Sequence, residues 1–287
     1  MHKFASTLFL LLFTATIAFS QTDSLVLKDI EWDAISPAGQ TELFIPSGGS
    51  VLAGFIYRAN GAQKHPTLLL LHGYPGNERN LDLAQVARAR GWNVIYFDYR
   101  GSWGSPGNFS FKNCVEDVAN VVSFCKKYQD SLKIDTANIV LFGHSMGGFV
   151  CLKALQQIPG IKKGFALSTW DIYKGLSKVK SEKALQEMVT NPNFGPKYFV
   201  LNASLMDIFS PVLKDPDYFN LSGTNARNAL AGKQIILLDE HQGNKELADE
   251  LKASNKAYFH YEVWKTDHPF TNKRVALIKM VLAFLAR

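Results

Sequence analysis

The chain has 287 residues, of which 47% are hydrophobic and 20% are charged, and its formal net charge is +6. This composition excludes wholesale disorder, and the length suits one large domain with a single core and room for an inserted cap. Because the basic residues form no block of five or more, ordinary solubility explains the charge and we expect no nucleic-acid partner.

The first residues have the pattern of a secretory signal peptide. Lys3 gives a basic start, an apolar run extends to Phe19, and the small residue Ser20 precedes Gln21. We therefore expect a signal peptide at residues 1–20, cleavage after Ser20, and export to the periplasm or beyond. An uncleaved anchor is the alternative, because the run is close to the shortest that spans a bilayer. After cleavage we expect no stable membrane anchor.

The three cysteines, Cys114, Cys125 and Cys151, do not suggest a disulfide framework. On one helix the first two would lie roughly 16 Å apart, which is too far for a bridge. We expect free thiols that are mostly buried.

From about residue 40 strand-like and helix-like runs alternate. The first strand-like stretch predicts a hairpin that turns at Ser47 to Ser50. The later apolar runs are continuous, as in strands that are covered on both faces. They are PTLLLLHG, NVIYFDYRG, NIVLFGHS, KGFALSTW, KQIILLD and AYFHYEVW. This alternation predicts an α/β fold with a mostly parallel sheet flanked by helices.

One connection is much longer than the others. About sixty residues separate Trp170 from Lys233, whereas most connections have only a few. The segment is rich in aromatic residues, is interrupted by prolines and has no strong strand pattern. It predicts a mainly helical cap insertion at about residues 171–233, inside a domain of residues 21–287. A surface elaboration without substrate contact is the alternative.

The stretch NIVLFGHSMGGFVCLKAL contains a candidate nucleophile, Ser145. Glycines around a serine between an apolar strand and a helix allow the cramped turn that exposes the hydroxyl group. In such a turn the N–H of Met146 points at a developing oxyanion. We predict Ser145 as the nucleophile and Met146 as one oxyanion donor.

Two glycine-containing loops follow earlier strands. In LLLLHGYPGN the N–H of Tyr74 can supply the second oxyanion donor. We interpret His72 in this loop as a structural residue. In YRGSWGSPG the glycines suit a rigid turn at the carboxyl edge of the sheet, where pocket walls belong. Trp103 in this loop, and His144 beside the serine, are the candidates for substrate contact.

His268 is the candidate general base. It lies in a short loop after the last strand-like run, just before a terminal helix. A loop outside the sheet edge can present an imidazole, whose ordinary pKa suits taking the serine proton and returning it to the leaving group.

Together HGYPGN, FDYRGSWGSPGNFSF, FGHSMGG and TDHPF resemble the α/β-hydrolase superfamily, and more closely its bacterial esterase-like or prolyl-oligopeptidase-like serine hydrolases. The resemblance extends from about Gln40 to Arg287. It implies an α/β-hydrolase fold with Ser145 as nucleophile and His268 as base. It also implies an oxyanion hole made by Met146 and Tyr74.

The third member of the triad is open. In relatives the acid commonly follows a glycine-rich turn after the penultimate strand, where this chain has Gly243 or Asn244. The resemblance therefore leaves three explanations. The acid is Asp239 or Glu240 at the strand end, with Asp239 preferred. Alternatively, Asp171 supplies it after the preceding strand, or no acid is present.

We expect an acyl-transfer enzyme that hydrolyses carboxylic esters of small or medium organic substrates through an acyl-enzyme on Ser145. The aromatic-rich cap suggests an apolar substrate pocket. A peptidase acting on short peptides or aminoacyl amides is the second candidate. A non-catalytic binding protein on the same fold is the third. The sequence contains no metal or phosphate-binding motif, and we expect no cofactor.

Overall fold

A single sheet organises the part of the chain that the computed structural model describes, which is residues 29–191 and 199–287. Its strands are β1 (Gly39–Ser47), β2 (Ser50–Arg58), β3 (His65–Leu71), β4 (Asn93–Phe97), β5 (Ile134–His144), β6 (Lys163–Leu167), β7 (Gln234–Asp239) and β8 (Tyr258–Val263). They lie in the order β1-β2-β4-β3-β5-β6-β7-β8. The β1–β2 and β2–β4 pairs are antiparallel and the other pairs are parallel. The predicted mostly parallel sheet and its first hairpin are confirmed.

The sheet lies within Glu31–Arg287, which form one compact unit. The expected signal peptide at residues 1–20 and its cleavage site are outside the described residues. Among the described residues, no helix combines the length and the apolar character needed to cross a bilayer.

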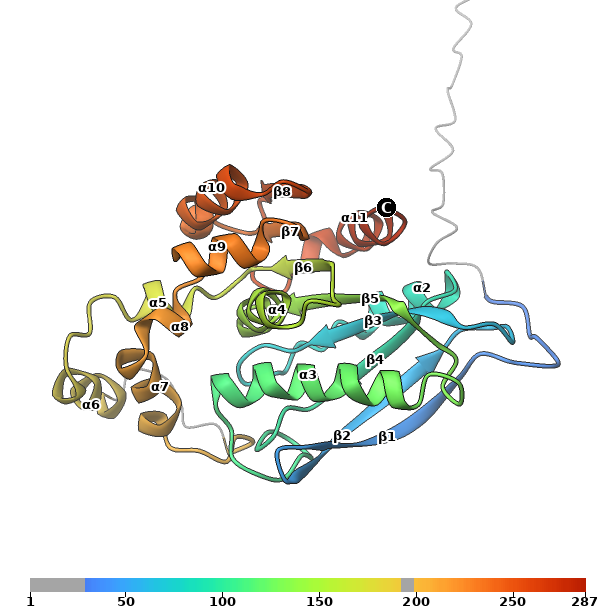
Figure 1. The fold of residues 1–287 in the computed structure, drawn as a ribbon, viewed down its shortest axis with the longest axis horizontal. Coiled ribbons are helices and arrows are strands. Elements are labelled where there is room, and N and C mark those ends of the chain that lie inside the picture. The colour runs from blue at the N-terminus through green and yellow to red at the C-terminus, as the bar shows by residue number, and fades with distance from the viewer. Residues whose placement is uncertain (1–28, 192–198) are drawn as a thin grey trace, which may run out of the picture. The chain divides into compact units, whose positions relative to one another are not determined.

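Helices cover both faces of the sheet. They are α2 (Leu81–Ala89), α3 (Phe111–Lys127), α4 (Met146–Gln157), α5 (Ile172–Gly175), α6 (Glu182–Thr190), α7 (Leu205–Lys214), α8 (Pro216–Phe219), α9 (Thr224–Leu230), α10 (Lys245–Ser254) and α11 (Arg274–Leu285). Figure 1 shows α3 and α4 across the near face of the sheet. Their apolar residues belong to one core cluster, and those of α2 and α11 belong to a second cluster on the opposite face.

The central strands supply both clusters because side chains alternate along a strand. In β3 Leu69 and Leu71 pack in the first cluster, and Leu68 and Leu70 pack in the second. All four are buried, so the continuous apolar run is the signature of a strand that is covered on both faces. The edge strand β1 instead alternates buried and exposed residues.

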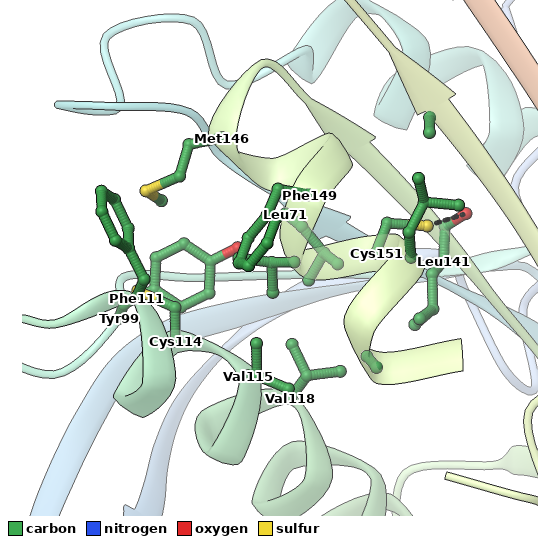
Figure 2. Packing of buried hydrophobic residues seen from close by; sticks show 14 of the residues in the cluster. Leu71, Tyr99, Phe111, Cys114, Val115, Val118, Leu141, Met146, Phe149 and Cys151 are labelled. Atoms are coloured by element: carbon green, nitrogen blue, oxygen red, sulfur yellow. Dashed lines mark hydrogen bonds between the residues drawn. The ribbon is translucent and has the colours of Figure 1, made fainter. Parts of the chain in front are cut away.

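The three cysteines are free and buried, as expected. Cys114 of α3 packs among Tyr99, Phe111 and other apolar side chains, and Cys151 of α4 lies near Leu141 (Figure 2). Burial raises the pKa of the Cys125 thiol to about 12. Such a thiol is protonated at neutral pH and unreactive, so these cysteines serve packing.

The long connection between β6 and β7 contains helices α5 to α9, which agrees with the expected helical insertion (Figure 1). Two of its aromatic residues, Phe209 and Phe219, are however part of the core. The ring centroids of Phe209 and Phe111 are 5.7 Å apart, as are those of Phe219 and Phe149. Both residues of the insertion are buried. Phe209 and Phe219 thus anchor the insertion to α3 and α4, and its role as a cap over substrate stays a prediction.

Candidate functional site

Ser145 stands in a sharp turn between β5 and α4, as its sequence context predicts. Its backbone dihedrals are φ 60° and ψ −119°, a strained combination for a residue with a side chain. The surrounding glycines make this turn possible. A Cβ atom at Gly143 would lie 1.9 Å from the carbonyl oxygen of Gly147, and one at Gly147 would lie 2.0 Å from that of Leu71.

The predicted oxyanion donors lie in the two segments next to this turn. Met146 is the first residue of α4, and the N–H groups of the first helical turn have no acceptor within the helix. Tyr74 follows Gly73, where a Cβ atom would lie 3.1 Å from the Cβ atom of Ser145. The roles of Met146 and Tyr74 stay predictions.

Glu240, and not Asp239, contacts His268. The Nδ1–H group of His268 donates to Oε1 of Glu240 at a distance of 2.7 Å. The Glu240 side chain is only 12% exposed, whereas the imidazole is 52% exposed. Because Nδ1 carries the proton in this bond, Nε2 is the nitrogen that can accept a proton. The pair thus has the arrangement of an imidazole base with its orienting carboxylate.

The preference for Asp239 is wrong, and the reason is the alternation of side chains along β7. Leu237 and Asp239 lie two residues apart on β7, so their side chains point to the same face of the sheet. Leu237 packs in the cluster shared with α3 and α4. His268 stands just before Phe270, which packs with α11 in the opposite cluster. Asp239, which is 0% exposed, therefore points away from the imidazole. Glu240 is the next residue and faces it.

Asp239 has a structural partner instead. The side-chain amide of Asn244 donates to Oδ1 of Asp239 at 3.1 Å and to the carbonyl oxygen of Thr169 at 2.7 Å. Burial raises the pKa of Asp239 to about 6 although the Asn244 hydrogen bond opposes this. Asn244, one of the two residues at the position where relatives carry the acid, therefore holds the loop after β7 in place.

Asp171, the alternative acid, caps a helix. Its Oδ1 accepts a hydrogen bond from the backbone N–H of Lys174 at 3.0 Å at the start of α5. Burial raises the pKa of the Asp171 carboxyl group. Its carboxylate is committed to the backbone of α5, while the imidazole is bonded to Glu240.

Ser168 is a member of the site that the sequence analysis did not identify. Its hydroxyl group donates to Oε2 of Glu240, so each carboxylate oxygen has one donor. Burial alone would raise the pKa of Glu240, but the hydrogen bonds from His268 and Ser168 outweigh it and lower the pKa to about 2. Glu240 is therefore ionised at neutral pH. The available signal was that Ser168 directly follows β6, at the edge where Ser145 follows β5.

His144 is buried, and its expected contact with substrate stays a prediction. It is 2% exposed, and its Nε2–H group donates to the backbone carbonyl oxygen of His268 at 2.9 Å. Burial and the nearby His268 lower the pKa of His144 to about 4, so it stays neutral. Its side chain holds the backbone of the loop that carries His268.

Trp103 and His72 support the loop that contains Tyr74. The indole N–H of Trp103 donates to the carbonyl oxygen of Pro75 at 2.7 Å. His72 is buried, and its Nδ1 is 2.8 Å from the carbonyl oxygen of Gly73. The structural reading of His72 is confirmed. Trp103 does not line the pocket that contains Ser145.

That pocket has a volume of about 300 Å³ and lies at the carboxyl ends of β5, β6, β7 and β8. It is lined by Ser145, Ser168, Thr169, Trp170, Asp171, Lys174, Gly175, His241, Gly243, Asn244 and His268. Trp170 stands in this lining beside several polar side chains, and the expectation of an apolar substrate pocket stays a prediction. Within the described residues, no group of three His, Cys, Asp or Glu side chains is arranged to hold a metal ion.

Comparisons with known proteins agree with this architecture. A family model described as the alpha/beta hydrolase fold matches residues 66–190, which is under half of the chain. An esterase of Pyrococcus furiosus superposes with a TM-score of 0.61 at 19% identity, over 87% of this chain and 90% of that one. The expected resemblance to the α/β-hydrolase superfamily is confirmed, and at this identity the superposition establishes the fold alone.

The curated relatives match only in part. An uncharacterised protein of Mycobacterium tuberculosis is 28% identical over 127 residues, which are 44% of this chain and 44% of the relative. A probable dipeptidyl-aminopeptidase B of Aspergillus fumigatus is 27% identical over 221 residues, which are 70% of this chain and 23% of the relative. The chain thus spans less than half the length of these relatives.

Proposed function

Because the chain has the α/β-hydrolase fold, we propose that it is a serine hydrolase that cleaves carboxylic esters through an acyl-enzyme on Ser145. The observation that carries the proposal is the hydrogen bond from His268 Nδ1 to Glu240 in the pocket that Ser145 also lines. It leaves Nε2 of His268, which lines the same pocket as Ser145, available as a base, and an ionised carboxylate balances the imidazolium that forms.

In the proposed mechanism Ser145 Oγ attacks the carbonyl carbon of the ester while His268 Nε2 takes the hydroxyl proton. The negative charge that develops on the carbonyl oxygen is met by the N–H groups of Met146 and Tyr74. His268 then protonates the departing alkoxide. Water repeats the sequence on the acyl-enzyme, and the acid and free Ser145 are released.

Esters are the first choice because the fold is shared with an esterase. A peptidase acting on short peptides or aminoacyl amides is the second candidate, and the similarity to a dipeptidyl-aminopeptidase over 70% of this chain favours it. In both reactions the same groups act on a carbonyl carbon, and the leaving group differs.

Hydrolysis of p-nitrophenyl esters with short and long acyl chains, compared with aminoacyl p-nitroanilides, tests the proposal. We expect turnover of esters that disappears in Ser145→Ala. Turnover of anilides alone would favour the peptidase. If the protein binds these esters or anilides but turns over neither class, it is a binding protein.

We also propose that the protein is exported and that cleavage follows Ser20. The basic start and the apolar run of the first twenty residues support this. N-terminal sequencing of the protein expressed from the full gene is expected to begin at Gln21. A protein that retains Met1 would contradict cleavage.

A further inference from the structure

Ser168 and Glu240 end two neighbouring strands at the edge where the pocket lies. β6 and β7 are parallel, with Leu167 opposite Leu238, so the residues that follow them emerge side by side. Ser145 follows β5 and His268 lies beyond β8. Four adjacent strands therefore deliver Ser145, Ser168, Glu240 and His268 to one edge.

The backbone of Ser168 has an unusual conformation that aims its side chain. Its φ angle is +46°, in the left-handed region that residues with a Cβ atom rarely adopt. The conformation is held by a hydrogen bond of 2.7 Å from the N–H of Ser168 to the carbonyl oxygen of Leu238. A strained residue persists where the surrounding structure holds it, and such residues cluster at functional sites.

The carboxylate of Glu240 depends on two donors for its orientation. Oε1 accepts from His268 and Oε2 accepts from Ser168. Hydrogen bonds to a charged acceptor are stronger than neutral ones, and one donor on each oxygen fixes the rotation of the carboxylate. Without the Ser168 hydroxyl group, Oε2 would lose its side-chain donor, and the hydrogen bond to the half-exposed imidazole would be the one side-chain hydrogen bond left among those described.

We propose that Ser168 is a positioning residue of the Ser145 site, whose hydroxyl group holds the Glu240 carboxylate in the orientation that fixes the His268 imidazole. This inference rests on the proposed function. Ser168 acts through Glu240 and takes no part in bond making. Its loss should therefore slow the chemical step and leave the binding of substrate unchanged.

Two variants remove the hydroxyl group, and a matched control removes a similar one elsewhere. Ser168→Ala keeps the Cβ atom, and Ser168→Gly also relieves the positive φ, so it is expected to fold at least as well. The control is Ser47→Ala. Ser47 is buried and donates to the carboxylate of Asp117 at 2.6 Å, outside the Ser145 pocket. For each of the three variants, kcat and KM are measured with the best ester substrate. The measurement is made in the otherwise wild-type protein and again in combination with Glu240→Gln.

We expect both Ser168 variants to lower kcat about tenfold to a hundredfold with KM nearly unchanged, as for loss of a hydrogen bond to a charged group. In the Glu240→Gln background the same substitutions should have almost no further effect, because the carboxylate through which Ser168 acts is gone. Ser47→Ala should lower the Tm and leave kcat unchanged.

An unchanged kcat in Ser168→Gly would overturn the inference. So would a loss confined to KM, which would indicate substrate contact, or an equal loss of kcat in both backgrounds. These results are separable from failure of the proposed function. The proposed function fails when the wild-type protein turns over no ester or when Ser145→Ala retains the wild-type rate. The inference about Ser168 fails alone when Ser145 is essential for turnover and Ser168 is not.

Discussion

The imidazole of His268 is oriented by Glu240, whose carboxylate oxygen Oε1 lies 2.7 Å from Nδ1. The adjacent acid, Asp239, points to the opposite face of the sheet and binds Asn244. The two acids are adjacent at the end of β7, yet Glu240 is placed to serve catalysis and Asp239 to stabilise a loop. This relationship leads to tests that treat the two acids separately.

Glu240→Gln should lower kcat about a thousandfold or more, because a neutral amide neither balances the imidazolium nor imposes the correct tautomer. Asp239→Asn should keep kcat within an order of magnitude of the wild-type value, since its side chain does not reach His268. Steady-state kinetics with one ester substrate compares the two. A larger loss in Asp239→Asn than in Glu240→Gln would contradict the assignment.

Asp239 should also shape the pH dependence of stability. Burial raises its pKa from 3.8 to about 6 in the folded protein. The folded state thus binds a proton more tightly than the unfolded chain, and the contribution of Asp239 is fully present below pH about 4 and is lost as the pH rises through about 6. Glu240 acts oppositely, because its lowered pKa gives stability that is lost as the pH falls below about 4.

Urea unfolding at pH 4.5 and pH 7 measures this effect. Replacing Asp239 by Asn removes its titration, so the stability difference between the two pH values should change by on the order of 1–3 kcal/mol. The change should favour the variant at pH 7. The same pH dependence in the wild type and in Asp239→Asn would contradict a buried carboxyl with a raised pKa.

The turn around Ser145 should not tolerate a side chain at Gly147. A Cβ atom there would lie 2.0 Å from the carbonyl oxygen of Leu71, which is backbone and cannot move aside. We expect Gly147→Ala to destabilise the protein by more than about 2 kcal/mol. Gly232→Ala is the control because a Cβ atom there meets nothing within 4 Å. Thermal unfolding compares them, and equal Tm values for the two variants would refute the packing argument.

The sequence alone predicted the mostly parallel sheet with its first hairpin, the turn at Ser145 and the loop of His268, because each depends on local pattern. The acid was mispredicted because the choice between Asp239 and Glu240 depends on which face of the sheet the loop of His268 approaches. That is decided by the packing of Phe270 with α11. Ser168 was missed because its role arises from the pairing of β6 with β7.

The aromatic residues of the insertion show a different limit of sequence reasoning. Phe209 and Phe219 are residues of the type that lines apolar substrate pockets, but they pack in the core with α3 and α4. A core and a pocket use the same residue types, and only the spatial arrangement separates them.

Labelling with a fluorophosphonate tests the central claim most directly. The folded protein would be treated with the probe and the modified peptide identified by mass spectrometry, in parallel with His268→Ala and Glu240→Gln. The account predicts one adduct, on Ser145, that forms far more slowly in both variants. The absence of an adduct on Ser145 in the folded wild-type protein would contradict an activated serine.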